Sequence, residues 1–288
     1  MNDQAFMLRE KMRRHRQLSA SRVKTTAICS GKGGVGKSNL SVNLGLEYVQ
    51  RGERVLIMDL DIGMANVHLL LGAEAKGSIV TMLDQELPIQ DVITTHHTGL
   101  HFIGGGSALK QLFSLNIEKQ NHFHRQLSQL EGMYDRFIFD LGAGLTLESL
   151  QFLKAADDVL LVTTPEPTSV TDAYAVLKYI SQLKENRPVS LLVNRAAHER
   201  EGRRTAESLI QAADKFLAFS VTFTGSIPDD TAVAKAVKAQ QPFLLHAPGS
   251  KAAKAVKQAA GVLDGGRRKQ ESSFTERLKR LFIKGDSP

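Results

Sequence analysis

The sequence predicts an α/β fold with a doubly wound, mostly parallel sheet flanked by helices. Short runs of apolar and β-branched residues recur along the chain, and polar residues do not alternate cleanly within them, which is typical of strands buried on both faces. Longer helical segments separate these runs, as the crossover connections of a parallel sheet require. A glycine-rich loop joins the first run to the first helical segment. With 288 residues, the chain is long enough for one large domain with a substantial core.

Strands and helices are expected to alternate along most of the chain. The expected strands are residues 25–29, 54–59, 100–103, 136–140, 159–163, 189–194 and 221–227. The expected helices are residues 39–50, 110–130, 168–183, 202–216 and 231–239. No internal repeat is visible, so the order predicts one domain with an appendage at each end.

The positive charge is concentrated at the two ends of the chain. The formal net charge is +7: residues 1–24 carry +5 and residues 267–288 carry +4, whereas residues 25–266 carry −2. We therefore divide the chain into a basic N-terminal segment, a nearly neutral domain, and a C-terminal linker with a helix. Basic tails favour anionic partners such as phosphate backbones, lipid headgroups or acidic proteins. Solvated tails that only aid solubility are the alternative.

Composition also excludes several classes of protein. Cys29 is the only cysteine, which excludes intramolecular disulfides and cysteine-based zinc or iron–sulfur sites within one chain. The apolar runs are far shorter than the ~20 residues of a membrane span. Residues 1–16 are charged and lack the apolar stretch of a signal peptide. We therefore expect a cytoplasmic protein.

The most informative stretch lies between the first strand and the first helix. It reads Gly-Lys-Gly-Gly-Val-Gly-Lys-Ser, which is the context and composition of a phosphate-binding loop. Its glycines let backbone N–H groups surround a phosphate, and the helix N-terminus adds its positive dipole end. Lys37 is expected to neutralise the β- and γ-phosphates, and the Ser38 hydroxyl to bind Mg²⁺. The residues expected to contact the nucleotide here are Gly31, Lys32, Gly33, Gly34, Val35, Gly36, Lys37, Ser38 and Asn39.

The lysine at position 32, at the start of Lys-Gly-Gly-Val-Gly-Lys-Ser, resembles the deviant Walker A motif of the MinD/ParA ATPases. The resemblance implies a P-loop NTPase fold of the MinD/ParA type, ATP and Mg²⁺ as ligands, and slow, dimer-dependent hydrolysis of ATP to ADP and phosphate. In that family this lysine reaches the nucleotide of the partner subunit. The resemblance therefore implies an ATP-dependent homodimer with Lys32 and Asn66 in its interface.

Two acidic strand ends resemble the switch regions of the same family. Asp61 follows the second expected strand, at the carboxyl edge where open α/β sheets bind ligands, and the resemblance implies that it orients the attacking water and lies near the metal. Asp140 ends the fourth expected strand before Leu-Gly-Ala-Gly, and the resemblance implies that it holds Mg²⁺ through water, together with Ser38. Lys32, Lys37 and Asp61 are thus the expected catalytic residues.

The end of the sixth expected strand bears on the choice of base. Guanine-binding relatives carry Asn-Lys-x-Asp at this place, whereas this chain has Asn194, Arg195 and, in place of the acid, Ala197. Pro228 and Asp229 resemble a second adenine-contacting loop of the family. We therefore expect ATP rather than GTP.

The C-terminal segment predicts a short basic amphipathic helix after a capping-box signal at residues 273–276. Its apolar residues fall within an arc of about 100° and its basic residues lie beside or opposite them; the residues concerned are Phe274, Leu278, Leu281, Phe282, Lys279 and Arg280. This helix resembles the membrane-targeting helix of MinD, which implies peripheral attachment to anionic lipids at the inner face of the cell membrane in the ATP-bound dimer. Docking of the helix on its own domain is the alternative, and docking in the monomer with release in the dimer combines the two.

The N-terminal segment contains Asp-Gln-Ala-x-x-Leu-Arg at residues 3–9. This motif before a MinD-like domain resembles the FlhG family, also called YlxH or FleN, whose members regulate the number and placement of flagella. The resemblance implies that Gln4, Leu8 and Arg9 activate the FlhF GTPase, with Gln4 near the nucleotide of that partner. It also implies contacts with basal-body or C-ring proteins of the flagellum.

Two other functions remain open from the sequence. A ParA-like partition ATPase would bind DNA nonspecifically, but the nearly neutral domain lacks the clustered cations that such binding needs, so nucleic acid is not the expected partner. A scaffold in which the nucleotide is only structural is the other alternative. An iron–sulfur carrier is disfavoured by the single cysteine, and a tyrosine kinase of the same lineage by the absence of tyrosine beyond Tyr179.

Overall fold

The computed structural model describes residues 23–61, 66–105, 117–183, 188–265 and 272–283. Its centre is an eight-stranded sheet in the order β3-β4-β2-β5-β1-β6-β7-β8. All neighbouring strands are parallel except β3 and β4, which form an antiparallel pair at one edge. The doubly wound, mostly parallel α/β fold is thereby confirmed.

The strands are β1 (Lys24–Ser30), β2 (Val55–Leu60), β3 (Ile93–Thr95), β4 (His101–Ile103), β5 (Arg136–Ala143), β6 (Asp158–Thr163), β7 (Val189–Ala196) and β8 (Thr222–Pro228). The helices before β5 are α2 (Lys37–Gln50), α3 (Val67–Leu71), α4 (Ile79–Asp84), α5 (Ile89–Val92) and α7 (Ile117–Leu130). Those after it are α8 (Leu147–Ala155), α9 (Pro167–Gln182), α10 (Glu199–Leu217), α11 (Thr231–Lys238), α12 (Phe243–His246), α13 (Lys251–Gly265) and α14 (Phe274–Ile283).

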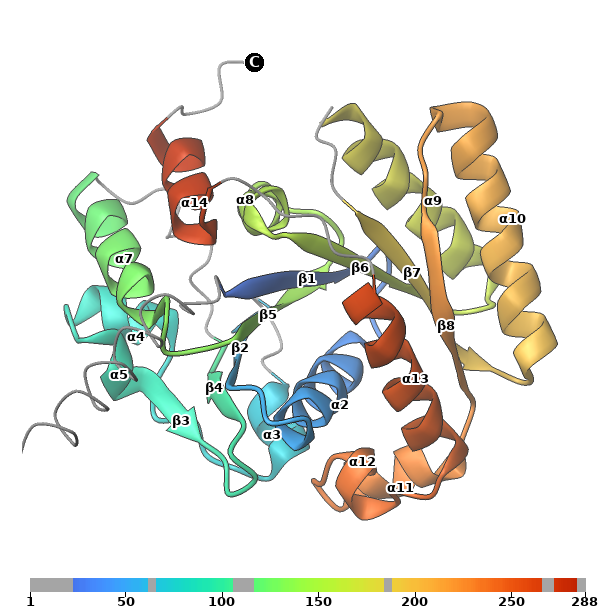
Figure 1. Cartoon of the computed structure of the whole chain (residues 1–288), viewed down its shortest axis with the longest axis horizontal. Coiled ribbons are helices and arrows are strands. Elements are labelled where there is room, and N and C mark those ends of the chain that lie inside the picture. The colour runs from blue at the N-terminus through green and yellow to red at the C-terminus, as the bar shows by residue number, and fades with distance from the viewer. Residues whose placement is uncertain (1–22, 62–65, 106–116, 184–187, 266–271, 284–288) are drawn as a thin grey trace, which may run out of the picture.

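Helices cover both faces of the sheet (Figure 1). On one face α2, α12 and α13 pack over the central strands, and α2 is buried along most of its length. On the other face α7, α8, α9, α10 and α14 enclose the larger part of the apolar core. Both cores follow from strands whose two faces carry Val, Ile, Leu and Phe, as a sheet covered on both sides requires.

Strand register brings two aspartates together at the carboxyl edge. Asp59 of β2 is directly opposite Asp140 of β5, and Ile28 of β1 is opposite the same Asp140. Because parallel strands end at one edge, the loop that follows β1 reaches the same place. The register therefore assembles the phosphate loop and both acidic strand ends in one region.

Six helices that the structure describes were not among those expected, and neither was the short strand β3; the helices are α3, α4, α5, α8, α12 and α13. α13 is rich in alanine, so its buried side, which includes Ala252, Val256 and Ala260, has only a weak apolar periodicity in the sequence. α8 is short and begins with a reciprocal cap between Thr146 and Ser149. The expected helix 110–130 is described only from Ile117 onward.

The C-terminal helix α14 docks on the domain, which is the alternative that the sequence left open beside membrane attachment. Phe274 and Leu278 are fully buried, and Leu281 packs partly buried against the same core. The Phe274 ring stacks on Phe139 with a centroid distance of 4.7 Å, and Phe152 lies beside it. The amphipathic pattern is the same for a helix that covers a core and for one that covers a membrane. Here α14 packs against α7 and α8, and its apolar face covers the aromatic rings of the core. The side chain of Phe282 lies outside the described residues, whereas Lys279 and Arg280 are exposed.

Polar contacts also hold the first turn of α14. Arg277, which is buried, donates to Asp157 Oδ1 at 2.7 Å and to the Ala155 carbonyl at 2.7 Å. Asp157 Oδ2 in turn accepts from the backbone N–H and hydroxyl of Thr25 in β1, at 2.9 and 2.8 Å. Directly after α7, Glu131 accepts from the Thr275 hydroxyl at 2.6 Å. The described part of the C-terminal segment is thus tied to the domain by directed bonds as well as by burial.

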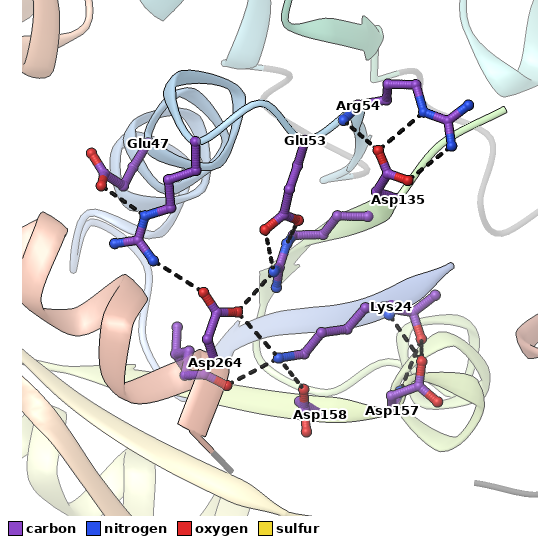
Figure 2. Close-up of polar contacts among 12 residues, drawn as sticks. Lys24, Glu47, Glu53, Arg54, Asp135, Asp157, Asp158 and Asp264 are labelled. Atoms are coloured by element: carbon purple, nitrogen blue, oxygen red, sulfur yellow. Dashed lines mark hydrogen bonds and ion pairs between the residues drawn. The ribbon is translucent and has the colours of Figure 1, made fainter. Parts of the chain in front are cut away.

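An ion network closes the amino edge of the sheet (Figure 2). Asp264, near the end of α13, lies 3.0 Å from Arg51 of α2, 2.8 Å from Arg136 of β5 and 3.6 Å from Lys24 of β1. Arg136 also pairs with Glu53 at 2.9 Å. The network joins four elements that are far apart in the sequence. Because β1 begins at Lys24, the domain extends slightly into the segment that was expected to be an N-terminal tail.

Within the described ranges, no helix combines the length and the apolar character that crossing a bilayer requires.

Candidate nucleotide-binding site

The phosphate loop occupies the turn from β1 into α2, and two glycines show why the sequence needs them there. Gly36, the residue before α2, has φ of 96°, a left-handed conformation that favours glycine. A Cβ at Gly36 would collide with the side-chain amide of Asn194, and a Cβ at Gly31 would collide with the backbone of Asp172 in α9. The loop is therefore clamped between β7 and α9, in a shape that side chains at these positions would prevent.

Lys37 and Asp140 form the buried floor of the site. Both side chains are nearly or fully buried, and Asp140 Oδ1 accepts a hydrogen bond from Ser41 at 3.0 Å. Burial, followed by the charge of Asp59, raises the pKa of Asp140 to about 7, while hydrogen bonds from Ser38 and Ser41 and the charge of Lys37 act in the opposite direction. Ser41 was not among the predicted site residues, although its place one turn after Lys37 puts it on the same helix side.

The floor fits a hydrated divalent cation. Asp140 Oδ2 is buried and has no hydrogen-bond partner among the described residues, so this oxygen is available to a ligand. In the described residues there is no group of three or more His, Cys, Asp or Glu side chains that could hold a metal ion. An ion at this place would therefore complete its coordination with the Ser38 hydroxyl, water and phosphate oxygens, which is the way Mg²⁺ is bound in nucleotide sites.

Asp59 organises the loop after β2, a role that the sequence analysis missed. Its carboxylate accepts from the backbone N–H groups of Asp61 at 3.1 Å, Asn66 at 3.0 Å and Val67 at 3.2 Å. Burial raises its pKa to about 6, against these three hydrogen bonds, which lower it. The sequence did contain a signal for this role, because Asp59 and Asp61 are two residues apart at the end of a strand. Asp59 lies within β2, whereas Asp61 follows the strand and faces the cavity.

A cavity of about 620 Å³ lies over the phosphate loop. Most of the predicted site residues that the structure describes line it, together with exposed apolar side chains of α3 and α11. The lining residues are Gly33, Gly34, Gly36, Lys37, Ser38, Asn39, Asp61, Asn66, Leu69, Leu70, Ala143, Arg195, Val237 and Gln240. Gly142 passes so close to Asp61 that a Cβ there would lie 3.3 Å from the Asp61 carboxylate. The two predicted switch segments thus meet at one wall of this cavity.

Lys32 lies outside this lining and points elsewhere. Its Nζ is 3.0 Å from Glu166 Oε2 and 3.1 Å from the Thr168 hydroxyl, at the start of α9. Lys32 and Glu166 are both exposed to solvent, so the pair is weak and breaks at little cost. Glu166 and Thr168 were not predicted, because nothing in the sequence relates them to residue 32.

The residues predicted to contact the base are divided between two places. Asn194 Nδ2 donates to the Val35 carbonyl at 2.7 Å, which ties β7 to the phosphate loop, and Arg195, with φ of 57°, lines the cavity. Pro228 pairs with Ala196 at the end of β8, and the Asp229 N–H donates to the Ala196 carbonyl at 2.8 Å. Pro228 and Asp229 do not line the cavity over the phosphate loop. The predicted activator residues Gln4, Leu8 and Arg9 lie outside the described residues.

Comparison with known proteins agrees with this geometry. Residues 26–243 match the family described as the CobQ/CobB/MinD/ParA nucleotide binding domain. Antiactivator FleN of Pseudomonas aeruginosa is 34% identical over 242 residues, which cover 84% of this chain and 86% of that protein. The flagellum site-determining protein YlxH of Helicobacter pylori is 34% identical, over 83% of this chain and 81% of its own length.

Solved structures share the fold. MinD in the MinC:MinD complex of Aquifex aeolicus superposes with a TM-score of 0.71 over 87% of this chain and all of that chain, at 24% identity. The cell division ATPase MinD of Pyrococcus furiosus has a TM-score of 0.67 at 25% identity, over 84% of this chain and 98% of its own. MinD of Pyrococcus horikoshii, which is complexed with Mg-ADP, has a TM-score of 0.67 at 23% identity, over 84% of this chain and 96% of its own. The chain therefore belongs to the CobQ/CobB/MinD/ParA family of nucleotide-binding domains and is an ATPase of the MinD/ParA type.

Proposed function

We propose that this ATPase is an ATP-gated switch that controls the number and placement of flagella. The observation that carries the nucleotide part is the floor of the cavity, where a buried Asp140 oxygen without a partner lies beside Lys37 and Ser38. The flagellar part is supported by FleN and YlxH, whose similarity extends over more than four fifths of each chain.

The residues of the cavity have distinct roles in this proposal. Backbone N–H groups of the loop and the Lys37 ammonium bind the phosphates, and Ser38 and Asp140 hold Mg²⁺, the latter through water. Mg²⁺ supplies positive charge against the phosphate oxygens when bound. Asp61 orients the attacking water, and Asp59 sets the position of Asp61 through the Asp61 N–H. Asn194, Arg195, Pro228 and Asp229 accommodate adenine.

The protein switches between a monomer and an ATP-bound dimer in this proposal. Lys32 leaves its exposed pair with Glu166 and binds the nucleotide of a second copy, and Asn66 lies in the same interface. The weakness of the exposed pair supports this step, because its loss costs little compared with a charge-assisted bond to a phosphate. Hydrolysis then removes the γ-phosphate and separates the two copies.

Membrane attachment requires α14 to leave the domain, since the face that would enter lipid now covers Phe139 and Phe152. We place the docked helix in the monomer and the released helix in the ATP-bound dimer at the cytoplasmic face of the membrane. Lys279 and Arg280 are exposed in the docked helix and are available to anionic lipids from the start. Two released copies in one dimer bind by avidity where one binds weakly.

The N-terminal segment activates the FlhF GTPase in this proposal, through Gln4, Leu8 and Arg9. The support is the Asp-Gln-Ala-x-x-Leu-Arg motif together with the flagellar relatives. Residues 1–22 precede β1 in the sequence. Basal-body and C-ring proteins are further proposed partners.

Steady-state turnover tests the first step. Wild-type protein is expected to hydrolyse ATP slowly with Mg²⁺, and Lys37→Ala to lower the rate at least ~100-fold because it removes the cation that faces the phosphates. Ser181→Ala, on the surface of α9 away from the cavity, is the matched control. Hydrolysis that survives Lys37→Ala would falsify the assignment of the loop.

Flotation with liposomes tests the membrane step. Asp61→Ala, which is expected to retain ATP, should float with anionic liposomes in ATP but not in ADP. Deletion of residues 272–288 uncovers the aromatic rings of the core, so the sharper variant is Lys279→Glu with Arg280→Glu, which leaves the docked face intact. This pair is expected to lose flotation while it retains ATP-dependent dimerisation in gel filtration. If the protein stays in solution with ATP and anionic lipid, α14 is a structural helix and the membrane step is wrong.

A further inference from the structure

A second cavity, of about 730 Å³, lies at the far edge of the sheet, between the first turn of α10, strand β8 and the outer side of α13. No residue that lines the cavity over the phosphate loop also lines this one. It is therefore a second surface, which we call the β8 groove; Pro228, one of the residues proposed to contact adenine, lines part of it.

The floor of the β8 groove is an unpaired strand edge. β8 is the last strand in the sheet order and pairs only with β7. In the part of the chain that the structure describes, no backbone hydrogen bond reaches the outer side of β8. Alternate residues of an edge strand direct their N–H and C=O groups outward, and natural proteins usually cover such an edge. Among the described residues, α10 and α13 pack on the two faces of β8, and no strand pairs with its outer edge.

The centre of β8 is shaped for close approach by another chain. Its register against β7 shifts between Leu191 and Leu192, so that Thr224 is an extra residue in the strand. The Thr224 hydroxyl is buried in the floor and has no hydrogen-bond partner. Next to it, Gly225 has no atom within 4 Å of the place where a Cβ would be. A glycine in a strand often marks the point where a second backbone approaches.

One wall of the groove is a stripe along α13. Lys251, Ala255, Gln258 and Val262 follow helical spacing and line the cavity, and Val262 is 45% exposed, which is unusual for a valine on a helix of the core layer. The stripe spans about 16 Å at 1.5 Å per residue. An extended peptide of about five residues has the same length.

Cations rim the groove. Arg203, Lys251 and Lys254 line it with His198, against the single carboxylate of Glu199. In the described residues neither Arg203 nor Lys254 forms a salt bridge, whereas Lys251 interacts with Asp230. The N-termini of α10 and α13, with the positive ends of their dipoles, both open at this groove. The surface is therefore complementary to negative charge.

We propose that the β8 groove binds an extended acidic segment of a partner protein, which adds to β8 as a further strand. Its backbone pairs with the free edge of β8. Carboxylates on one side of the added strand face Arg203 of α10, apolar side chains on the other side pack on Ala255 and Val262 of α13, and Lys254 adds to the positive potential along the groove. The free edge of β8 and the α13 stripe both continue along the length of the groove. This arrangement favours an extended polypeptide over a compact anion. This interaction is independent of the proposed flagellar role.

The test uses a fluorescein-labelled heptapeptide of alternating glutamate and valine as the probe, with fluorescence anisotropy against the full-length protein in low salt. Saturable binding to wild type is expected. Arg203→Glu with Lys254→Glu should weaken it about tenfold, since two favourable charge contacts become repulsive. The matched control is Arg125→Glu with Lys178→Glu. These are exposed cations of α7 and α9 that form no salt bridge within the described residues, and the variant should bind like wild type.

Two further measurements separate strand addition from simple charge attraction. The same peptide with N-methyl groups on alternate backbone nitrogens is expected to lose binding. The unmodified peptide is expected to slow amide hydrogen exchange at whichever of Gly225 and Ser226 directs its N–H outward. ATP hydrolysis should be equal in both double variants, which shows that they are folded. Absence of saturable binding to wild type, equal binding by the two double variants, or full binding of the N-methylated peptide would each overturn the proposal.

Discussion

The amino and carboxyl ends of the parallel strands, called here the amino and carboxyl edges of the sheet, differ in how their charged side chains are compensated. At the amino edge Lys24 and Arg136 lie opposite each other in register, and the acids Glu53, Asp158 and Asp264 lie around them (Figure 2). At the carboxyl edge Asp59 and Asp140 lie opposite each other, and burial raises the pKa of both. Like charges are thus compensated within the protein at one edge and left for a ligand at the other. The first edge stabilises the fold, whereas the second gives up stability, which bound nucleotide and Mg²⁺ would restore under the proposed function.

The largest effect on stability is expected at the C-terminal helix α14, which covers the aromatic part of the core. Phe274→Ala removes a fully buried ring from the stack with Phe139 and Phe152, and should lower the stability of the docked helix by about 3–4 kcal/mol. Limited proteolysis at residues 266–271 and urea unfolding measure this loss. Lys279→Ala, on the exposed side of the same helix, is the control and should change neither. Equal protease resistance of both variants would mean that α14 contributes little to the domain.

An effect of opposite sign is expected at the carboxyl edge. The pKa of Asp140 rises from 3.8 to about 7 on folding, so the folded protein binds an extra proton in that range and its stability falls as pH rises from about 4 to 7. Asp140→Asn removes the buried charge and should stabilise the nucleotide-free protein by about 2 kcal/mol at pH 8. Thermal unfolding at pH 6 and pH 8 checks this: the variant should lose most of the pH dependence, and Asp59, whose pKa rises to about 6, accounts for the rest.

The same variant should lose the stabilisation that ATP with Mg²⁺ gives to wild type, because the amide is a poorer partner for a cation. Asp140→Asn could instead be less stable than wild type at pH 8. That result would mean that neighbouring groups already stabilise the Asp140 carboxylate in the nucleotide-free protein, and that the amino and carboxyl edges differ less in charge compensation than the structure indicates.

The smallest effect on stability is expected at Lys32. Its pair with Glu166 is exposed, so Lys32→Ala should change the free energy of unfolding by less than about 0.5 kcal/mol. ATP-dependent dimerisation, followed by light scattering, should nevertheless be lost, since the proposed role of Lys32 lies in the dimer. Glu166→Ala is the informative partner variant: it frees Lys32 and should leave dimerisation intact or strengthen it.

Features that depend on local chemistry were predictable from the sequence. The phosphate loop is continuous in the chain, and strand direction alone places Asp61 and Asp140 at one edge. Contacts between residues that are distant in the sequence were not predictable. Asp59 acts on backbone groups several residues away, Lys32 meets Glu166 across 134 residues, and α13 is held by alanine packing that leaves little pattern.

The C-terminal helix is the most instructive case. Its periodicity, charge and capping residues agree with both a membrane helix and a core helix, because both environments take an apolar face and leave the basic residues outside. The deciding contacts are with Phe139, Asp157 and Glu131, and no rule of spacing relates those residues to Phe274, Arg277 and Thr275. Only the folded domain supplies that information.

The burial of Phe274 and Leu278 has a consequence for any surface that attracts α14. One face of a helix cannot contact two environments at once, so lipid and domain compete for it, and the free energy of docking sets a threshold that the lipid must exceed. A contact far from any membrane, such as the Arg277–Asp157 pair, therefore tunes that threshold. Each 1.4 kcal/mol added to docking raises the amount of lipid needed about tenfold. Sequence changes at Asp157 or Glu131 would shift where and when the protein responds without altering a residue that lipid would touch.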